Sequence, residues 1–205
     1  MGMKQILVMM AAVVLVGQSV VADEKLIADP IVEKAIRNIL EKPEGELTEA
    51  DLAKITILVL LDTNITDEGL KDVAKLQKLV VLGLNDTNIT DAGLKEVAKL
   101  QNLRELYLED TQITGAGLKE VAKLQKLIFL KLNRTQITDE GLKEVAKLQK
   151  LKILELNRTK ITDAGLKEVA KLKQLTLLHL FGTKITAEGI AELKKALRSC
   201  TIVGP

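Results

Sequence analysis

Apolar residues follow two alternating patterns along most of the chain. Leu82 and Leu84 alternate with other residues at period two, which predicts a short strand with one buried side. A few residues later, Leu94, Val97 and Ala98 have the i, i+3, i+4 spacing of an amphipathic helix, with Lys and Glu between them. The pattern therefore predicts a unit made of a strand, a turn and a short helix.

This unit recurs throughout the chain with a constant period. A threonine marks it every 24 residues, at 63, 87, 111, 135, 159 and 183. A period of this length with a Leu-x-x-Leu-x-Leu core is typical of leucine-rich repeats. Since one unit cannot bury its apolar side alone, the units must stack around a continuous core. We predict an α/β fold: a right-handed leucine-rich repeat solenoid, or horseshoe arc, with a parallel concave sheet and convex helices.

Residues 1–22 have the features of a signal peptide. One charge, Lys4, precedes the apolar run Ile6–Val16, which is shorter than the roughly twenty residues of a membrane span. Small residues at Val20 and Ala22 suit cleavage before Asp23. We expect a secreted, periplasmic or cell-envelope protein with no stable membrane span after cleavage; the alternative is an uncleaved anchor.

The remaining chain divides into a cap, the repeats and a second cap. Residues 23–46 are expected to form an N-terminal capping helix and lead-in, because Asp29-Pro30 is a helix-start signal before an apolar stripe. Residues 47–186 form the repeats, the first of which is shortened. Residues 187–205 form a C-terminal cap, in which Cys200 is expected to be a buried residue rather than a reactive thiol.

Polar positions inside the unit predict how the turns are held. Each repeated threonine hydroxyl is expected to bond the backbone of a neighbouring turn. Thr90 and Asp91 stand where a helix needs an N-cap, and Gly115 and Ala187 replace that aspartate in two units. A glycine two residues after it, such as Gly93, fits either a close approach of units or a positive φ.

The composition narrows the possible functions. Apolar residues make up 47% of the chain but aromatics only 1%, so the core must consist of Leu, Ile, Val and Ala. A net charge of +2 is too balanced to suggest nucleic-acid binding by bulk charge. One Cys and one His cannot make a disulfide framework or a Cys/His zinc site. No metal or cofactor is expected.

The residues beside the strand leucines point away from the core and form the candidate site. All three aromatics and the only histidine fall at these positions. Because aromatics are over-represented at binding hot spots, we predict a partner-binding surface of Glu105, Tyr107, Glu109, Phe129, Lys131, Ile153, Glu155, His179 and Phe181. The alternative is that Phe129 and its apolar neighbours only shield the strands.

The next position along each unit changes sign through the chain. Asp62, Asp86 and Asp110 are followed by Arg134 and Arg158. Stacked aspartates would repel one another unless they are solvated or matched by a cation or a basic partner. A solvated charged rim is the simpler interpretation.

No catalytic arrangement is apparent in the sequence. No motif places a nucleophile beside His179, and no glycine-rich phosphate loop follows a strand. Glu105, Glu109 and Glu155 could approach one another, but paired carboxylates catalyse only in a cleft that shifts their pKa values. We therefore expect no enzymatic activity.

The repeat, the lead-in 42–52 and the tail 192–200 resemble exported bacterial leucine-rich repeat proteins over about residues 30–204. The wider superfamily, which includes internalin-like adhesins and F-box leucine-rich repeat receptors, consists mostly of protein-binding scaffolds. The resemblance implies a non-catalytic scaffold that binds a protein through its concave face, and we expect a monomer. The alternatives are a structural envelope or adhesion spacer and an unrecognised hydrolase.

Overall fold

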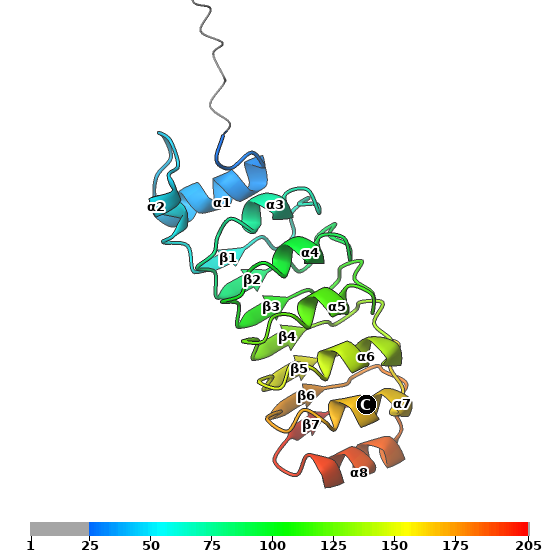
Figure 1. Ribbon diagram of the computed structural model, residues 1–205. Helices are drawn as coiled ribbons and strands as arrows, with labels where there is room; N and C mark the ends of the chain where they lie inside the picture. The colour runs from blue at the N-terminus through cyan, green and yellow to red at the C-terminus, as the bar shows by residue number, and fades with distance from the viewer. Residues whose placement is uncertain (1–24, 205) are drawn as a thin grey trace, which may run out of the picture.

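The computed structural model describes residues 25–204, which form one stack around a seven-stranded parallel sheet (Figure 1). Each strand pairs with the residues 24 positions later, as Leu58 does with Leu82. The strands follow one another in sequence order: β1 Ile57–Val59, β2 Val81–Gly83, β3 Glu105–Tyr107, β4 Phe129–Lys131, β5 Ile153–Glu155, β6 Leu177–His179 and β7 Thr201–Val203. The sheet is open, and the stack is nearly straight in Figure 1.

The repeat helices line the opposite side of the stack from the exposed sheet face. They are α3 Leu70–Val73, α4 Leu94–Val97, α5 Leu118–Val121, α6 Asp139–Val145 and α7 Asp163–Val169. Two helices, α1 Pro30–Leu40 and α2 Glu49–Leu52, precede the sheet, and α8 Ala187–Ala196 precedes the last strand. The predicted unit of strand, turn and helix is confirmed, as is the α/β leucine-rich repeat solenoid.

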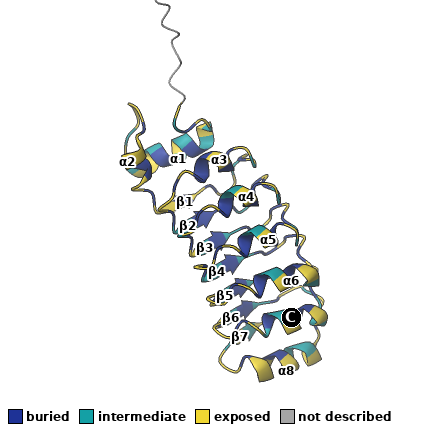
Figure 2. Ribbon diagram, viewed as in Figure 1, coloured by how far each residue is buried: buried dark blue, intermediate teal, exposed yellow. Residues whose placement is uncertain are grey.

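The core runs along the whole stack between the strands and the helices. The middle leucine of each strand from β1 to β6 is completely buried, as are Leu94 and Leu70 on the helices. Figure 2 shows this burial as a continuous band through the units. Each buried aliphatic side chain contributes about 1.5–3 kcal/mol of burial free energy, so stacking supplies what a single unit lacks. No aromatic residue belongs to the core of the described chain.

The repeated threonines do not join neighbouring turns, and that prediction is wrong. The hydroxyl of Thr111 donates to the carbonyl oxygen of Leu108, in its own turn, at 2.7 Å. The same bond occurs at Thr63, Thr87, Thr135, Thr159 and Thr183. The carbonyl three residues earlier is within reach of the short side chain. The hydroxyl therefore closes the turn within each unit.

Carboxylates at the helix starts make the bonds between units instead. Asp91 accepts from the backbone N–H of Thr114 at 2.8 Å and from its hydroxyl at 2.5 Å. The Thr114 hydroxyl in turn accepts from the N–H of Ala116. Equivalent bonds link Asp67 to Thr90, Asp139 to Thr162 and Asp163 to Thr186. Thr114 therefore caps the turn of its own unit, while Asp91 bonds to the unit that follows it.

The helix-start glycines are required by close approach. Gly93 has φ −66°, an ordinary helical value. A Cβ atom on Gly93 would lie 2.3 Å from Oδ1 of Asp67 in the preceding unit. At Gly115 the aspartate is missing, and the backbone comes so close that a Cβ on Gly141 would lie 2.9 Å from the Cα of Gly115. Gly115 thus brings two units together without a carboxylate link.

The N-terminal helix closes one end of the core. Asp29 caps α1 by accepting from the N–H groups of Ile31 and Val32 at 2.9 and 3.0 Å, as the sequence predicted. Asp72 of the first repeat accepts from the N–H groups of Ala28 and Asp29, both at 2.7 Å. Other units carry Glu at this position, as at Glu96. The side chain of Asp72, shorter than that of Glu, thus attaches the cap to the repeats.

The C-terminal end is closed by α8 and β7. Leu193 and Leu197 are buried, whereas Ile190, Cys200 and Ile202 are partly buried against the core. Burial raises the pKa of the Cys200 thiol. The expectation that Cys200 packs in the cap holds, although its burial is incomplete.

No helix within residues 25–204 is long and apolar enough to cross a membrane. The predicted signal peptide, residues 1–22, lies outside the described residues.

Candidate functional site

The strand face is the side of the sheet that the helices do not cover. It consists of the first and third residues of each strand and the second residue after the strand. The structure places all nine predicted site residues on this face, on β3 to β6 or just after β3 and β6. Phe181 is exposed and the other eight are half-buried. Their role in binding remains a prediction.

An aromatic pair lies near the centre of this face. The ring centroids of Tyr107 and Phe129 are 4.8 Å apart with a 31° tilt. The Tyr107 hydroxyl donates to Oε2 of Glu105 at 2.8 Å. Burial, together with this carboxylate, raises the pKa of Tyr107 to about 12, so the phenol stays neutral. The pair presents a fixed apolar surface with one polar edge.

The charged side chains beside the aromatic pair have polar partners within the face. Lys131 forms an ion pair with Glu109. Asn133 donates to Oε2 of Glu155 at 2.7 Å, and Nδ1 of His179 lies 4.0 Å from Oε1 of the same carboxylate. These contacts join β3 to β6 across the face. The three glutamates are held apart in separate pairs rather than gathered in a cleft.

Asparagines on this face have a structural role that the sequence reasoning missed. Oδ1 of Asn133 accepts from the backbone N–H of Asn157 in the next unit at 2.8 Å. Asn85 accepts in the same way from Glu109, and Asn157 from Phe181. These bonds hold consecutive units in register. The regular spacing of the asparagines was the available signal.

The N-terminal end of the face carries an exposed apolar patch that the predicted site does not include. Ile57, Val59 and Leu61 are 54%, 52% and 45% exposed. Val81 lies beside them on β2, and Gly83 adds no side chain. Three apolar residues at alternating positions were the signal for this patch in the sequence.

The charged rim along the ends of the strands has a backbone requirement. Asp62, Asp86, Asp110, Arg134 and Arg158 all have φ between 51° and 56°, the left-handed region. Aspartate tolerates this region better than most residues, and Gly182 follows at the same position with φ 70°. Arg134 and Asp110 form an exposed ion pair at 3.3 Å. The rim is solvated, as the simpler interpretation predicted.

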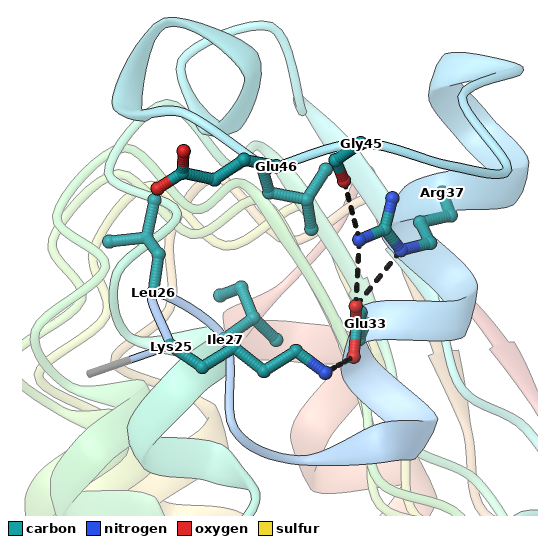
Figure 3. Close-up of a pocket in the computed structure, with 8 residues that line it drawn as sticks. Lys25, Leu26, Ile27, Glu33, Arg37, Gly45 and Glu46 are labelled. Carbon is teal, nitrogen blue, oxygen red and sulfur yellow. Dashed lines mark hydrogen bonds and ion pairs between the residues drawn. The ribbon is translucent and has the colours of Figure 1, made fainter. Parts of the chain in front are cut away.

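A pocket at the N-terminal cap, lined by residues of 25–47, is stabilised by paired charges (Figure 3). Glu33 pairs with both Lys25 and Arg37, and Arg37 donates to the carbonyl oxygen of Gly45 at 2.9 Å. The Lys25 hydrogen bond is the main reason that the pKa of Glu33 lies below its usual value. These contacts of Glu33 and Arg37 join the lead-in to α1. In the described chain no group of three His, Cys, Asp or Glu side chains could hold a metal ion.

The comparisons with known proteins agree with this geometry. The family model of the leucine-rich repeat region matches residues 49–202. The chain belongs to the leucine-rich repeat family. No match was found among curated proteins.

Two solved structures that this leucine-rich repeat chain resembles are internalins of Listeria monocytogenes. For the internalin InlF the TM-score is 0.64 at 24% identity, over 85% of this chain and 55% of that one. This chain thus spans about half of InlF. For internalin C2 the TM-score is 0.51 at 26% identity, over 87% of this chain and 95% of that one. The predicted internalin-like fold is confirmed.

Proposed function

We propose that this protein is a non-catalytic scaffold that is exported from the cytoplasm and binds a protein partner through its strand face. The observation that carries the proposal is the Tyr107–Phe129 pair on a sheet face that no described helix covers. Aromatic side chains near the middle of a surface are the usual anchors of protein interfaces. Membership of the leucine-rich repeat family supports the same role.

The contacts around the aromatic pair favour binding over simple shielding of the strands. Glu105 and Glu155 each accept a hydrogen bond from a neutral side chain within the face, so a protein that covers these carboxylates must supply positive charge. The bonds also hold the side chains in one arrangement before binding. A surface prepared in this way loses less conformational entropy when a partner arrives.

Alanine variants test where the partner binds. Phe129→Ala and Tyr107→Ala should each weaken binding by about 2 kcal/mol or more. Lys119→Ala and Lys143→Ala, on the helix side, are the controls and should leave affinity unchanged. Titration calorimetry measures binding of a partner captured from the extracytoplasmic fraction, and circular dichroism melts report folding. Loss of binding in the lysine variants alone would refute the strand-face proposal.

Export has a separate test. We propose cleavage before Asp23, because the apolar run is short and ends in small residues. N-terminal sequencing of the protein from its native host should find Asp23 first. A chain that still begins at Met1 and stays with the membrane would show that the segment is an anchor.

A further inference from the structure

Exposed apolar residues gather at both ends of the strand face. Of the six large hydrophobic residues that are most exposed in the described chain, five lie on this face. Ile57, Val59 and Leu61 form the N-terminal group, and Phe181 and Val203, 59% and 46% exposed, form the C-terminal group. Exposed apolar groups of this kind mark interaction surfaces.

The rim charges are opposite at these two ends. Asp62 and Asp86 stand beside the N-terminal apolar group, whereas Arg158 stands beside Phe181. Among residues 25–204, the one ion pair within the rim joins Asp110 to Arg134 at its middle. The outer rim charges are thus free to meet charges of the opposite sign, and the same surface carries both signs.

In place of the monomer expected from the sequence, we propose that the strand face binds a second copy of this chain, face to face. The two-fold axis lies between β3 and β4 and runs parallel to the strands. It keeps the strand direction and reverses the stacking direction, so β1 faces β6, β2 faces β5 and β3 faces β4 of the second copy. This inference rests on the proposed function, because it names an occupant of the proposed binding surface.

The arrangement places most of the exposed apolar residues of one copy against apolar residues of the other, although Val59 meets His179 and Val203 on β7 has no counterpart. Each residue meets the residue at the same position of the opposing unit. Leu61 meets Phe181 of the second copy, at the C-terminal end of the strands. Val81 meets Ile153 of the second copy, and Ile57 meets Leu177.

The same axis pairs the rim charges. Asp86 meets Arg158 of the second copy, and Asp110 meets Arg134. At the opposite edge Arg104 faces Ile128, so no like charges oppose there. A two-fold axis through β4 would instead place Arg134 against itself, which is unfavourable. Charge complementarity therefore selects the axis between β3 and β4.

The area of the face indicates a weak dimer. Six strands about 4.8 Å apart, with the five residues of each unit that span the face covering about 16 Å, give roughly 450 Å² per copy, compared with about 800 Å² per partner in a standard interface. An interface below the standard size indicates weak self-association, about micromolar or weaker. The second copy covers Tyr107 and Phe129, so another protein partner must displace it. Self-association would thus regulate access to the proposed binding surface.

Charge exchange on the full-length chain tests the dimer. Asp86→Arg and Arg158→Asp each oppose like charges twice in a homodimer, and each should weaken self-association at least tenfold. The backbone accommodates both changes, because Asp and Arg already occupy this rim position at positive φ in other units. An equimolar mixture of the two variants restores opposite charges at both contacts. The mixed heterodimer should associate within about threefold of the wild type.

Sedimentation velocity at several concentrations measures the association, with Lys95→Glu on α4 as a charge-change control. Residues 1–22 are the same in all variants, so association through them would not respond to mixing. The dimer would be overturned by a wild type that stays monomeric at about 100 μM. It would also be overturned by charge variants that associate as the wild type does, or by a mixture of the two variants that does not recover association.

The dimer and the proposed function can be separated with the same variants. The Asp86→Arg variant should still bind an external partner, and the double variant Asp86→Arg/Phe129→Ala should not. That result supports the proposed function whether or not the dimer exists. Recovery in the mixture establishes the dimer even if no external partner binds.

Discussion

The two ends of the stack are closed by different interactions. At the N-terminal end, Ile27, Val32 and Ile36 are fully buried, and carboxylates attach the cap to the first repeat. At the C-terminal end, Ile190 and Ile202 are only partly buried. Stability in a stacked protein is a sum of neighbour contacts, so the better-buried end should open less often at neutral pH.

The two ends of the stack also differ in their carboxylates. Glu33, Asp51 and Asp72 at the N-terminal end have pKa values below their usual range. For Asp51 the cause is hydrogen bonding, first from Lys42 and then from Lys54. For Asp72, hydrogen bonds from Lys75, Asp29 and Ala28 outweigh the opposing effect of burial. The N-terminal cap therefore depends on three ionised carboxylates, while the C-terminal cap combines apolar contact with one, Asp163, whose pKa is lowered by hydrogen bonds from Thr186.

Core truncation should give the largest difference between the ends. Ile36→Ala should lower the free energy of unfolding by about 2–5 kcal/mol, because it opens a cavity beneath a fully buried side chain. Ile190→Ala is the matched change at the other end and should cost about 1 kcal/mol, since that side chain is partly exposed. Denaturant titration followed by circular dichroism compares them. Equal losses would show that the two caps are equally packed.

Removing the carboxylate that holds the N-terminal cap should have the next largest effect. Asp72→Ala leaves the N–H groups of Ala28 and Asp29 without their acceptor and should cost about 1–3 kcal/mol. Glu96→Ala removes the equivalent side chain one unit later, where it pairs only with exposed Lys99. That control should cost less than about 0.5 kcal/mol. A similar loss in both variants would mean that Asp72 acts only as a surface charge.

Threonine variants compare the middle of the stack with its end. Thr111→Val leaves the buried carbonyl oxygen of Leu108 without its donor and should cost about 1–2 kcal/mol. Thr63→Val should cost less, because Thr63 is less buried and solvent can reach the carbonyl. Chemical denaturation of both variants gives the order. Negligible effects in both would show that water replaces the hydroxyl.

Acid should reverse the order in which the ends open. A carboxyl whose folded pKa is lowered stabilises the fold above its unfolded pKa, and this contribution is lost as the pH falls through the folded value. The N-terminal cap should therefore loosen below about pH 4. Amide NMR signals from 26–54 should change before those from 187–203. Simultaneous loss at both ends would contradict the assignment of the carboxylates to the cap.

The strand leucines show how much of the fold was predictable. Leu82 and Leu84 indicated a strand, and a constant period of 24 residues placed every strand in the same register. The helix start at Asp29-Pro30 was also predicted correctly. These features depend on local spacing and on the need of each unit to bury one side.

The candidate site was predictable in its position but not in its interactions. Alternation along β3 and β4 placed Tyr107 and Phe129 on the uncovered face. The pairing of Lys131 with Glu109 and of Asn133 with Glu155 required knowing which long side chains meet across adjacent strands. Alternation also placed Ile57, Val59 and Leu61 on this face, but how exposed they are depends on what the N-terminal cap leaves uncovered.

By itself, the sequence determined the repeat, the parallel register and the side of each unit that is buried, because apolar periodicity admits one way to stack identical units. Only the tertiary structure decided which polar groups bond within a unit and which bond between units. Thr111 stays in its own turn, whereas Asp91 reaches Thr114 in the next unit. The reason is geometric: a hydrogen bond depends on a few tenths of an ångström and on direction, and residues about 24 positions apart acquire both only when the units are packed.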